Sequence, residues 1–329
     1  TRNKKPDDVM GFYILHEGFI GVFDGELKED DYDDIKDKKI VRNSDNGWLG
    51  ITDKYWVTAI VPPKDKNFKS TFLYKDNFRA NYILNSPVTI NPKSTSENEV
   101  RLFVAAKEVE TVDGYAESEN IEKFDLTIDW GWFYFFTKPL FFVIDYLFKF
   151  SGNFGFAIVL ITLAIRALFF PLANFSFRSM AKMKAVTPEM QRLKELHKDD
   201  KVKLQQEMMA LYRKEKINPA SGCLPVLIQI PFFFAIYKML FISLEMRHQP
   251  FFGWIKDLSA ADPTSIFNLF GLIPWDPPSF MIIGIWPILM GASMWVQQKL
   301  NPAPADPIQA KIFAFFPLFL TIILASFPS

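Results

Sequence analysis

Arg166 is the residue whose type and position most strongly suggest chemistry, because it lies inside a long apolar segment, residues 154–172. At about 1.5 Å per helical residue, this segment is long enough to cross a hydrocarbon core of ~30 Å. An arginine in the core costs on the order of 2.5–3.5 kcal/mol, so it must be hydrated or paired. Thr162 lies one helical turn before Arg166, and Asn174 two turns after it on the same side. The sequence therefore predicts a polar stripe that deepens toward one membrane surface.

Two structural explanations compete with a functional role for Arg166. The side chain could reach the headgroups of the nearer leaflet, but about one and a half turns is the limit of its length. It could also pair with an acidic residue, but none of the long apolar segments contains Asp or Glu. The functional interpretation is a hydrated, positive pocket within one leaflet. Such a pocket would lower the cost of moving a polar or acidic segment across the hydrocarbon.

Four apolar segments predict a transmembrane bundle. They are residues 154–172, 223–244, 280–296 and 312–327. Prolines inside the last three are tolerated when neighbouring helices satisfy the freed carbonyl groups, which favours a bundle. Gln229 in the second segment, and Ser293 and Gln297 in the third, are further candidates to line a groove, although helix packing explains the last two equally well. Lys238, near the outer end of the second segment, is expected to extend toward the headgroups.

The distribution of basic residues predicts the orientation. Residues 174–220 contain eleven Lys and Arg, whereas residues 245–279 contain only two. By the positive-inside rule, the first of these regions is cytoplasmic and the second lies outside. The region before the first span then also lies outside. The single cysteine, Cys223, cannot form an intrachain disulfide and is expected to be a small buried apolar residue.

The cytoplasmic region, residues 174–220, is predicted to be a helical hairpin. Thr187 and Pro188 are typical of a helix start, and Asp199 or Asp200 is expected to cap the second helix. Five methionines belong to this region: Met180, Met183, Met190, Met208 and Met209. They either form the core of the hairpin or offer a pliable surface for varied apolar clients.

Residues 1–128 have the pattern of an all-β domain. Short alternating runs recur at residues 18–23, 48–51, 56–61, 71–74, 87–90 and 100–104. Several strands at such spacing predict an antiparallel sandwich. The acidic run at residues 28–39 is expected to be a solvated loop. Residues 129–151 are predicted to contain an amphipathic helix in the membrane interface, with Asp145 and Lys149 forming an i,i+4 pair.

Motifs for catalysis are absent from the sequence. It contains no GxxxxGK[ST], HExxH, GxSxG or CxxC pattern, and the predicted topology separates His16, His197 and His248. We therefore expect no catalytic residues, no metal, no cofactor and no enzymatic activity.

Four groups of residues match a family pattern. They are residues 152–155 (GNFG), 161–166 (ITLAIR) and 171–172 (PL); 179–184 (SMAKMK); 206–212 (QEMMALY), 218–219 (NP), 222–225 (GCLP) and 229–231 (QIP); and 254–260 (WIKDLSA) with 262–263 (DP). With these groups the sequence resembles the YidC-type membrane protein insertases, the bacterial branch of the Oxa/Alb family. The region before residue 129 also resembles, less sharply, the periplasmic domain of the Gram-negative members.

The resemblance implies an α+β membrane protein of the bacterial inner membrane: a periplasmic antiparallel β-sandwich (residues 1–128), an interfacial helix (129–151) and a transmembrane insertase domain (152–329). It implies insertion of nascent membrane proteins, alone or beside the Sec translocon, through a groove open to cytoplasm and lipid. Arg166 would lie inside the groove and Thr162 would line it. The ribosome and the lipid bilayer are further expected partners, with no nucleic-acid specificity.

The family pattern also includes an N-terminal anchor helix, the first half of the periplasmic sandwich and a last span, which residues 1–329 do not contain. The alternative function is a membrane transporter or channel. That class is expected to show inverted repeats or several ionisable groups within the membrane, and the sequence shows neither.

Overall fold

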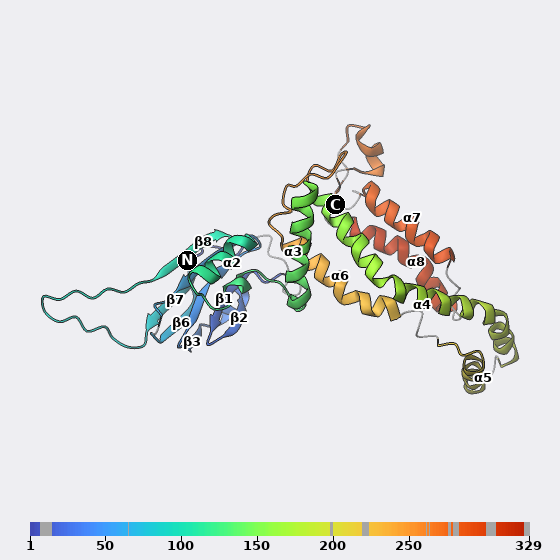
Figure 1. Ribbon diagram of the computed structural model, residues 1–329, viewed down its shortest axis with the longest axis horizontal. Coiled ribbons are helices and arrows are strands. Elements are labelled where there is room, and N and C mark those ends of the chain that lie inside the picture. Colours follow the sequence, from blue (N-terminus) through green and yellow to red (C-terminus); the bar gives the residue numbers. More distant parts are fainter. Residues whose placement is uncertain are drawn as a thin grey trace. The chain divides into compact units, whose positions relative to one another are not determined.

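The protein is described here as a computed structural model (Figure 1). The structure describes residues 1–6, 15–64, 66–197, 200–218, 224–260, 262, 264–275, 278, 283–300 and 307–325. The chain divides into two compact units. The first comprises Thr1–Lys138 and Ala235–Glu245, and the second comprises Pro139–Phe234 and Met246–Ser329. Helices α3 and α6 each contribute to both units.

Two antiparallel sheets form the first unit, which confirms the predicted sandwich. One has the strand order β2-β1-β4-β5-β8 and the other the order β3-β6-β7. The strands are β1 (Gly18–Phe23), β2 (Glu26–Asp31), β3 (Ile40–Ser44), β4 (Gly47–Thr52), β5 (Trp56–Val61), β6 (Phe68–Lys75), β7 (Asn77–Leu84) and β8 (Arg101–Ala106). Gly47 begins β4 with φ 137°, and a Cβ atom there would lie 1.8 Å from the carbonyl oxygen of Val22, so only glycine fits.

Aromatic side chains fill the space between the two sheets. Phe19 and Phe23 point to the same face of β1 because strand side chains alternate. They pack against Phe68, Phe72 and Phe78 from the smaller sheet. The Phe19 and Phe72 ring centroids are 4.9 Å apart, close enough for a favourable aromatic pair. This core explains why the strands form where alternating apolar residues occur.

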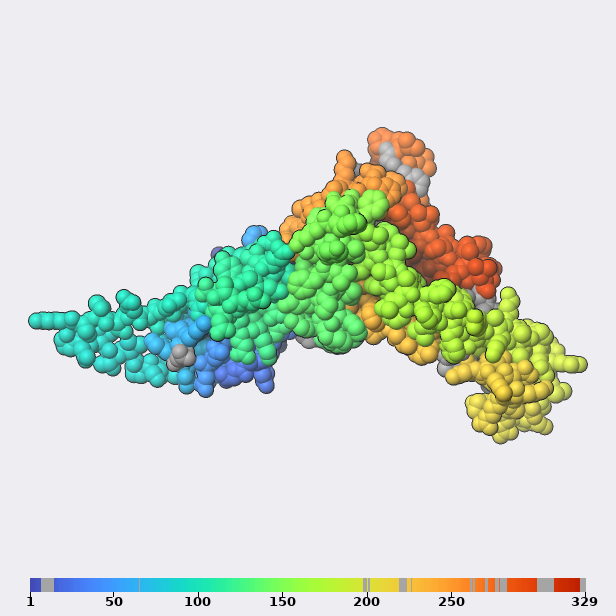
Figure 2. Space-filling model, viewed as in Figure 1, coloured from blue at the N-terminus to red at the C-terminus, as the bar shows by residue number. Residues whose placement is uncertain are grey.

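Several local predictions for the first unit were wrong. Residues 87–90 form no strand, and the whole segment 85–100 is exposed and extends away from the sheets (Figures 1 and 2). The acidic run is not a loop but β2 followed by α1 (Tyr32–Asp37), because Tyr32 and Ile35 are 1% exposed and belong to the core. The unit also contains the helix α2 (Val109–Ser118) and the 3-10 helix η1 (Phe124–Thr127), so it is not all-β.

The unpredicted strands have a common physical cause. β2 lies at the edge of its sheet and has the sequence ELKEDD. Charged residues are common in edge strands because they prevent pairing with other chains, and here they leave no alternating apolar pattern to predict a strand. β3 and β7 are rich in polar residues as well, and pairing with β6 rather than local pattern decides their conformation.

Helices dominate the second unit. They are α3 (Tyr134–Ser151), α4 (Phe154–Leu196), α5 (Lys201–Lys214), α6 (Leu224–Ile242), the 3-10 helix η3 (Ile266–Gly271), α7 (Ile285–Leu300) and α8 (Pro307–Leu324). Among the described residues, α4 is the one helix both long and apolar enough to cross a membrane. Shorter apolar stretches occupy Leu227–Ile242 and Lys311–Leu324. Asp145 and Lys149 of α3 form the predicted ion pair at 2.8 Å.

α4 continues without a break from the first apolar segment into the hairpin. The predicted helix start at Thr187 and Pro188 was therefore wrong, since both residues lie inside α4. The Thr187 hydroxyl donates to the carbonyl oxygen of Met183, one turn earlier, instead of capping a new helix. Asp200 does cap α5 by accepting a hydrogen bond from the backbone N–H of Lys203 at 2.9 Å. Asp199 and Cys223 lie outside the described residues.

α7 and α8 pack side by side (Figure 1). Gly291 on α7 faces Thr321 on α8 so closely that a Cβ atom at residue 291 would lie 2.1 Å from the Thr321 hydroxyl oxygen. Small residues let helices approach in this way, and close approach increases van der Waals contact in a bundle. The described part of α7 begins at Ile285, and the predicted span start at residues 280–282 lies outside the described residues.

Candidate functional site

The polar residues of the first apolar segment lie along α4. Thr162 and Arg166 are one turn apart and both are exposed on the helix. The Thr162 hydroxyl donates to the carbonyl oxygen of Ile158 at 2.7 Å, which satisfies it within the helix. Within the described parts of the chain, Arg166 has no hydrogen bond and no ion pair. Asn174 is also exposed, further along α4.

Of the other sequence-predicted groove residues, Gln229 is half-buried on α6, while Ser293 and Gln297 are exposed on α7. α4 and α6 touch through the rings of Phe169 and Phe232, whose centroids are 5.0 Å apart. Each ring lies about one turn after a polar candidate, Arg166 on α4 and Gln229 on α6. The helical segments that carry these two candidates are therefore neighbours.

The hairpin methionines divide into two groups. Met190 is buried, and Met183 and Met208 are partly buried, around a cluster of Val186, Leu211 and Ile217. Met209 is 53% exposed, and Met180 is half-buried. Three of the five methionines thus contribute to the hairpin core, one of the two interpretations left open by the sequence.

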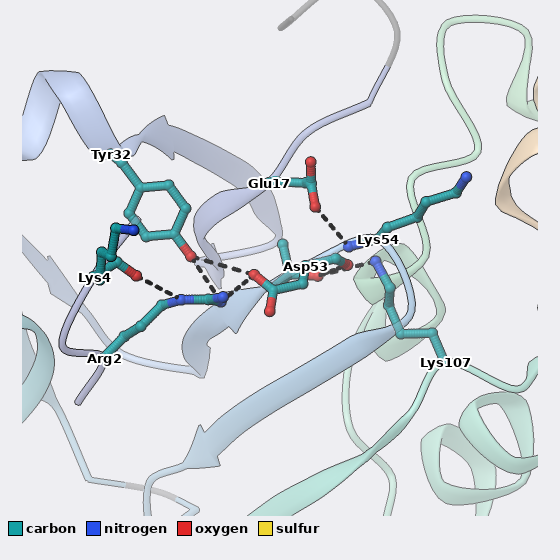
Figure 3. A network of polar contacts seen from close by, with 8 residues as sticks. Arg2, Lys4, Glu17, Tyr32, Asp53, Lys54 and Lys107 are labelled. Atoms are coloured by element: carbon teal, nitrogen blue, oxygen red, sulfur yellow. Dashed lines mark hydrogen bonds and ion pairs between the residues drawn. The ribbon is translucent and has the colours of Figure 1, made fainter. Parts of the chain in front are cut away.

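A cluster of charged residues in the first unit has no counterpart in the sequence predictions (Figure 3). Lys107, at the end of β8, is 4% exposed, and its ammonium group donates to the Thr52 hydroxyl at 3.1 Å. Burial lowers the pKa of Lys107 to about 8, although the negative charges of Asp129 and Glu17 act in the opposite direction. Arg2 extends the network by donating to Asp53 and to the Tyr32 hydroxyl.

Lys238 belongs to the same cluster, which corrects its predicted position. Instead of extending toward headgroups, its ammonium group lies 2.6 Å from the Asp129 carboxylate, and the Lys238 side chain is 14% exposed. Asp129 also accepts hydrogen bonds from the backbone N–H groups of His16 at 2.9 Å and Gly131 at 3.0 Å. Because these hydrogen bonds hold the Asp129 carboxylate in place, Lys238 forms an ion pair within the protein instead of contacting lipid headgroups. Because 109 residues separate the pair, no local signal predicts it.

A second ionic group anchors the first turns of α3. Lys138 pairs with Asp113 at 3.0 Å and with Asp125 at 2.9 Å. Burial alone would lower the pKa of Lys138, but hydrogen bonds and charge from the two aspartates outweigh burial and raise it. Burial would raise the pKa of Asp125, but hydrogen bonds from Tyr134 and Lys138 lower it.

The chemistry available at these sites is electrostatic. No group of three or more His, Cys, Asp or Glu side chains that could hold a metal occurs in the described part of the chain. In the first unit, Lys238 with Asp129, Lys138 with Asp113 and Asp125, and Arg2 with Asp53 form ion pairs that hold its elements together. Arg166, in contrast, keeps its charge and donors available.

Comparison with known proteins identifies the family. The model of the 60Kd inner membrane protein family matches residues 146–329, more than half of the chain. The chain belongs to this family. The YidC periplasmic domain model matches residues 1–143. This member of the 60Kd inner membrane protein family is accordingly an inner membrane protein with a periplasmic domain, as the resemblance indicated.

Relatives within the family match along almost the whole chain. The membrane protein insertase YidC of Pelagibacter ubique is 65% identical over 328 residues, covering 100% of this chain and 59% of the relative. The protein of the same name from Brucella suis is 52% identical, covering 100% and 55%. The one from Rickettsia conorii is 51% identical, covering 96% and 57%. The chain thus spans somewhat over half the length of these curated relatives.

A solved structure is also similar, the active YidC insertase crystal structure with the first transmembrane domain resolved. It is 18% identical, covers 95% of this chain and 79% of the other, and has a TM-score of 0.47.

Proposed function

We propose that this chain works as a membrane protein insertase and chaperone. It moves nascent membrane-protein segments into the inner membrane through a hydrophilic groove open to the cytoplasm and to lipid, without nucleotide hydrolysis. The observation that carries the proposal is Arg166, a cation in the most apolar part of α4 with no partner among the described residues. Relatives named as insertases match across the whole chain and support the same function.

In this mechanism, water held near Arg166 lowers the free-energy cost of moving polar parts of the client into the membrane. An unpaired guanidinium group in hydrocarbon holds water around itself, since losing that water costs several kcal/mol. A hydrated depression beside Arg166 shortens the distance that a polar or acidic client segment travels without water. Thr162 and Asn174 on α4 extend this polar path, and Gln229 lies on the neighbouring helix. Ser293 and Gln297 on α7 complete the proposed lining.

The hairpin receives the client in this mechanism. Eleven basic residues against six acidic ones in residues 174–220 attract the anionic surface of the ribosome without base specificity. Met209 on α5, which is 53% exposed, offers a flexible apolar contact to emerging segments, and the half-buried Met180 on α4 is a second such contact. Insertion then proceeds alone or beside the Sec translocon, with lipid as the destination of the client.

The test is complementation of a strain depleted of its insertase. The Arg166→Ala variant is expected to lose most insertion of single-span substrates, and Arg166→Lys to keep most of it, because charge rather than bidentate geometry is required. Arg178→Ala removes a charge from the same helix outside the apolar segment and serves as the matched control. Normal insertion by Arg166→Ala would refute the charged groove. Failure of the lysine variant would instead show that guanidinium geometry is needed.

Photocrosslinking locates the path directly. A crosslinking residue at position 162 or 166 is expected to capture a stalled nascent chain. The same probe at Leu168 points to the opposite side of α4, because two helical residues turn by about 200°. Equal capture from positions 166 and 168 would contradict a groove on one face.

A further inference from the structure

A pocket lies where the hairpin meets the apolar helices. Its volume is about 390 Å³. α4 contributes Phe175, Ser179 and Lys182, which follow one another at intervals of four and three residues and so share one helical face. The segment after α5 contributes Lys216 and its neighbours, and the first residue of α6 closes the pocket. All of these elements belong to the second unit.

A second pocket of about 370 Å³ shares the wall formed by Lys216, Ile217 and Asn218. On its other side lie residues of α5, including Arg213. Lys182 of α4 therefore lies on one side of residues 216–218 and Arg213 of α5 on the other. Lys216, within that stretch, adds a third basic side chain. Among the residues that the structure describes, no acidic side chain lines either pocket. Among the described residues, neither Lys182 nor Lys216 has an ion-pair partner.

The pocket lies at the ends of the apolar segments of both helices that border it. Phe175 is three residues past the apolar segment of α4, which corresponds to about 4.5 Å along the helix axis. Leu224 begins α6. Lys182 is further along α4, but helical side chains tilt toward the N-terminus of their helix. Its long side chain therefore leans back toward the headgroup region.

The lining matches a ligand with an anionic head and an apolar tail. Two ammonium groups and the Ser179 hydroxyl are suited to phosphate oxygens. Phe175 and Leu224 supply apolar surface on the membrane side. A free phosphate would leave this apolar half unused.

We propose that this pocket binds the phosphate headgroup of an anionic phospholipid from the leaflet next to the hairpin. Basic pockets beside membrane helices bind such headgroups because each lysine adds to the attraction of the anionic leaflet. The bound lipid holds the segment after α5 against α4 and so fixes the angle at which the hairpin leaves the membrane. The proposal does not depend on insertase activity, because it concerns an equilibrium lipid site.

The test measures lipid binding to the purified full-length protein in a neutral detergent by native mass spectrometry. Phosphatidylglycerol is titrated, with phosphatidylcholine and inorganic phosphate as separate arms. The variant Lys182→Gln/Lys216→Gln is expected to bind phosphatidylglycerol roughly 10- to 30-fold more weakly. The control Lys184→Gln/Lys214→Gln removes the same charge two residues away on each side and should change the affinity by less than about twofold.

Three outcomes would overturn the proposal. Equal losses in the two double variants would indicate general surface charge. Equal affinity of the wild-type protein for phosphatidylglycerol and phosphatidylcholine would exclude headgroup recognition. Displacement of the lipid by an equal concentration of inorganic phosphate would identify a free-phosphate site. Phe175→Ala provides a fourth measurement, since an unchanged lipid affinity would show that the apolar half of the pocket holds no acyl chain.

Discussion

Lys238 on α6 and Asp129, which precedes α3, form an ion pair with 2.6 Å between Nζ and Oδ2. Their side chains are 14% and 17% exposed, so both charges are largely removed from water. The last turns of α6 consequently belong to the same compact unit as the β-sandwich. Lys54 reinforces this attachment by placing its ammonium group 3.9 Å from the centre of the Phe241 ring.

Removing either partner of this ion pair should destabilise the first unit, and loss of Asp129 should cost more than loss of Lys238. Asp129→Leu should lower the free energy of unfolding by about 4 kcal/mol, because it leaves Lys238 unpaired and two backbone N–H groups without acceptors. Lys238→Met should cost only about 2 kcal/mol, since Asp129 keeps the hydrogen bonds from His16 and Gly131. Urea unfolding read by pulse proteolysis measures both values.

The double variant Lys238→Met/Asp129→Leu tests whether the two residues are coupled. Its loss should be smaller than the sum of the single losses, because no unpaired charge remains. Lys75→Met, at an exposed position of β6, is the control for removing a lysine. Strictly additive losses would contradict the ion pair.

Lys107 is expected to make the stability of the first unit depend on alkaline pH. Burial lowers its pKa from the ordinary 10.5 to about 8, so between these values the unfolded chain binds more protons than the folded chain. The free energy of unfolding should therefore rise with pH from about 8 to 10.5, by roughly 3 kcal/mol, since one pKa unit corresponds to about 1.4 kcal/mol. Below pH 8 Lys107 is protonated in both states and contributes no slope.

The measurement is the urea midpoint at several pH values for the wild type and for Lys107→Gln. The difference between the two proteins removes the contribution of all other titrating groups. Lys75→Gln should retain the wild-type slope. Parallel profiles for the wild type and Lys107→Gln would show that the Lys107 amine titrates normally.

The hairpin methionines are expected to differ sharply in their effect on stability. Met190 is 6% exposed and packs against Leu211, whereas Met209 is 53% exposed. Met190→Ala should cost about 2 kcal/mol and increase amide hydrogen exchange throughout α5. Met209→Ala should leave exchange unchanged and weaken crosslinks from the hairpin to a client. Similar exchange rates in the two variants would contradict the observed packing.

Contact between α7 and α8 should be disrupted by a single methyl group. Gly291→Ala places Cβ 2.1 Å from the Thr321 hydroxyl oxygen, and overpacking of this kind costs about 1–3 kcal/mol. Thermal unfolding in detergent should show a lower midpoint. Adding Thr321→Ala should restore much of the loss, because the clashing atom is removed. Thr321→Ser keeps that oxygen and should not rescue, so equal rescue by both variants would refute the contact.

Local sequence pattern accounts well for some elements. Alternating apolar residues predicted β1 at residues 18–23 without error, because both its position and its register depend on which side chains enter the core. The family pattern was likewise confirmed across the helical region. Edge strand β2 and helix α1 escaped prediction, since charges dominate their sequences and their stability comes from Tyr32 and Ile35 packing on other elements.

The candidate site likewise has features that local sequence predicts and features that only tertiary contacts decide. The sequence by itself determined that Arg166 is a lone cation in an apolar helix and that the hairpin is basic, because composition and helical period are local properties. Only the tertiary structure decided that Lys238 pairs with Asp129, and that Lys182 and Lys216 line one pocket. Such contacts join residues far apart in the chain, and their energies depend on burial and geometry that arise only after folding.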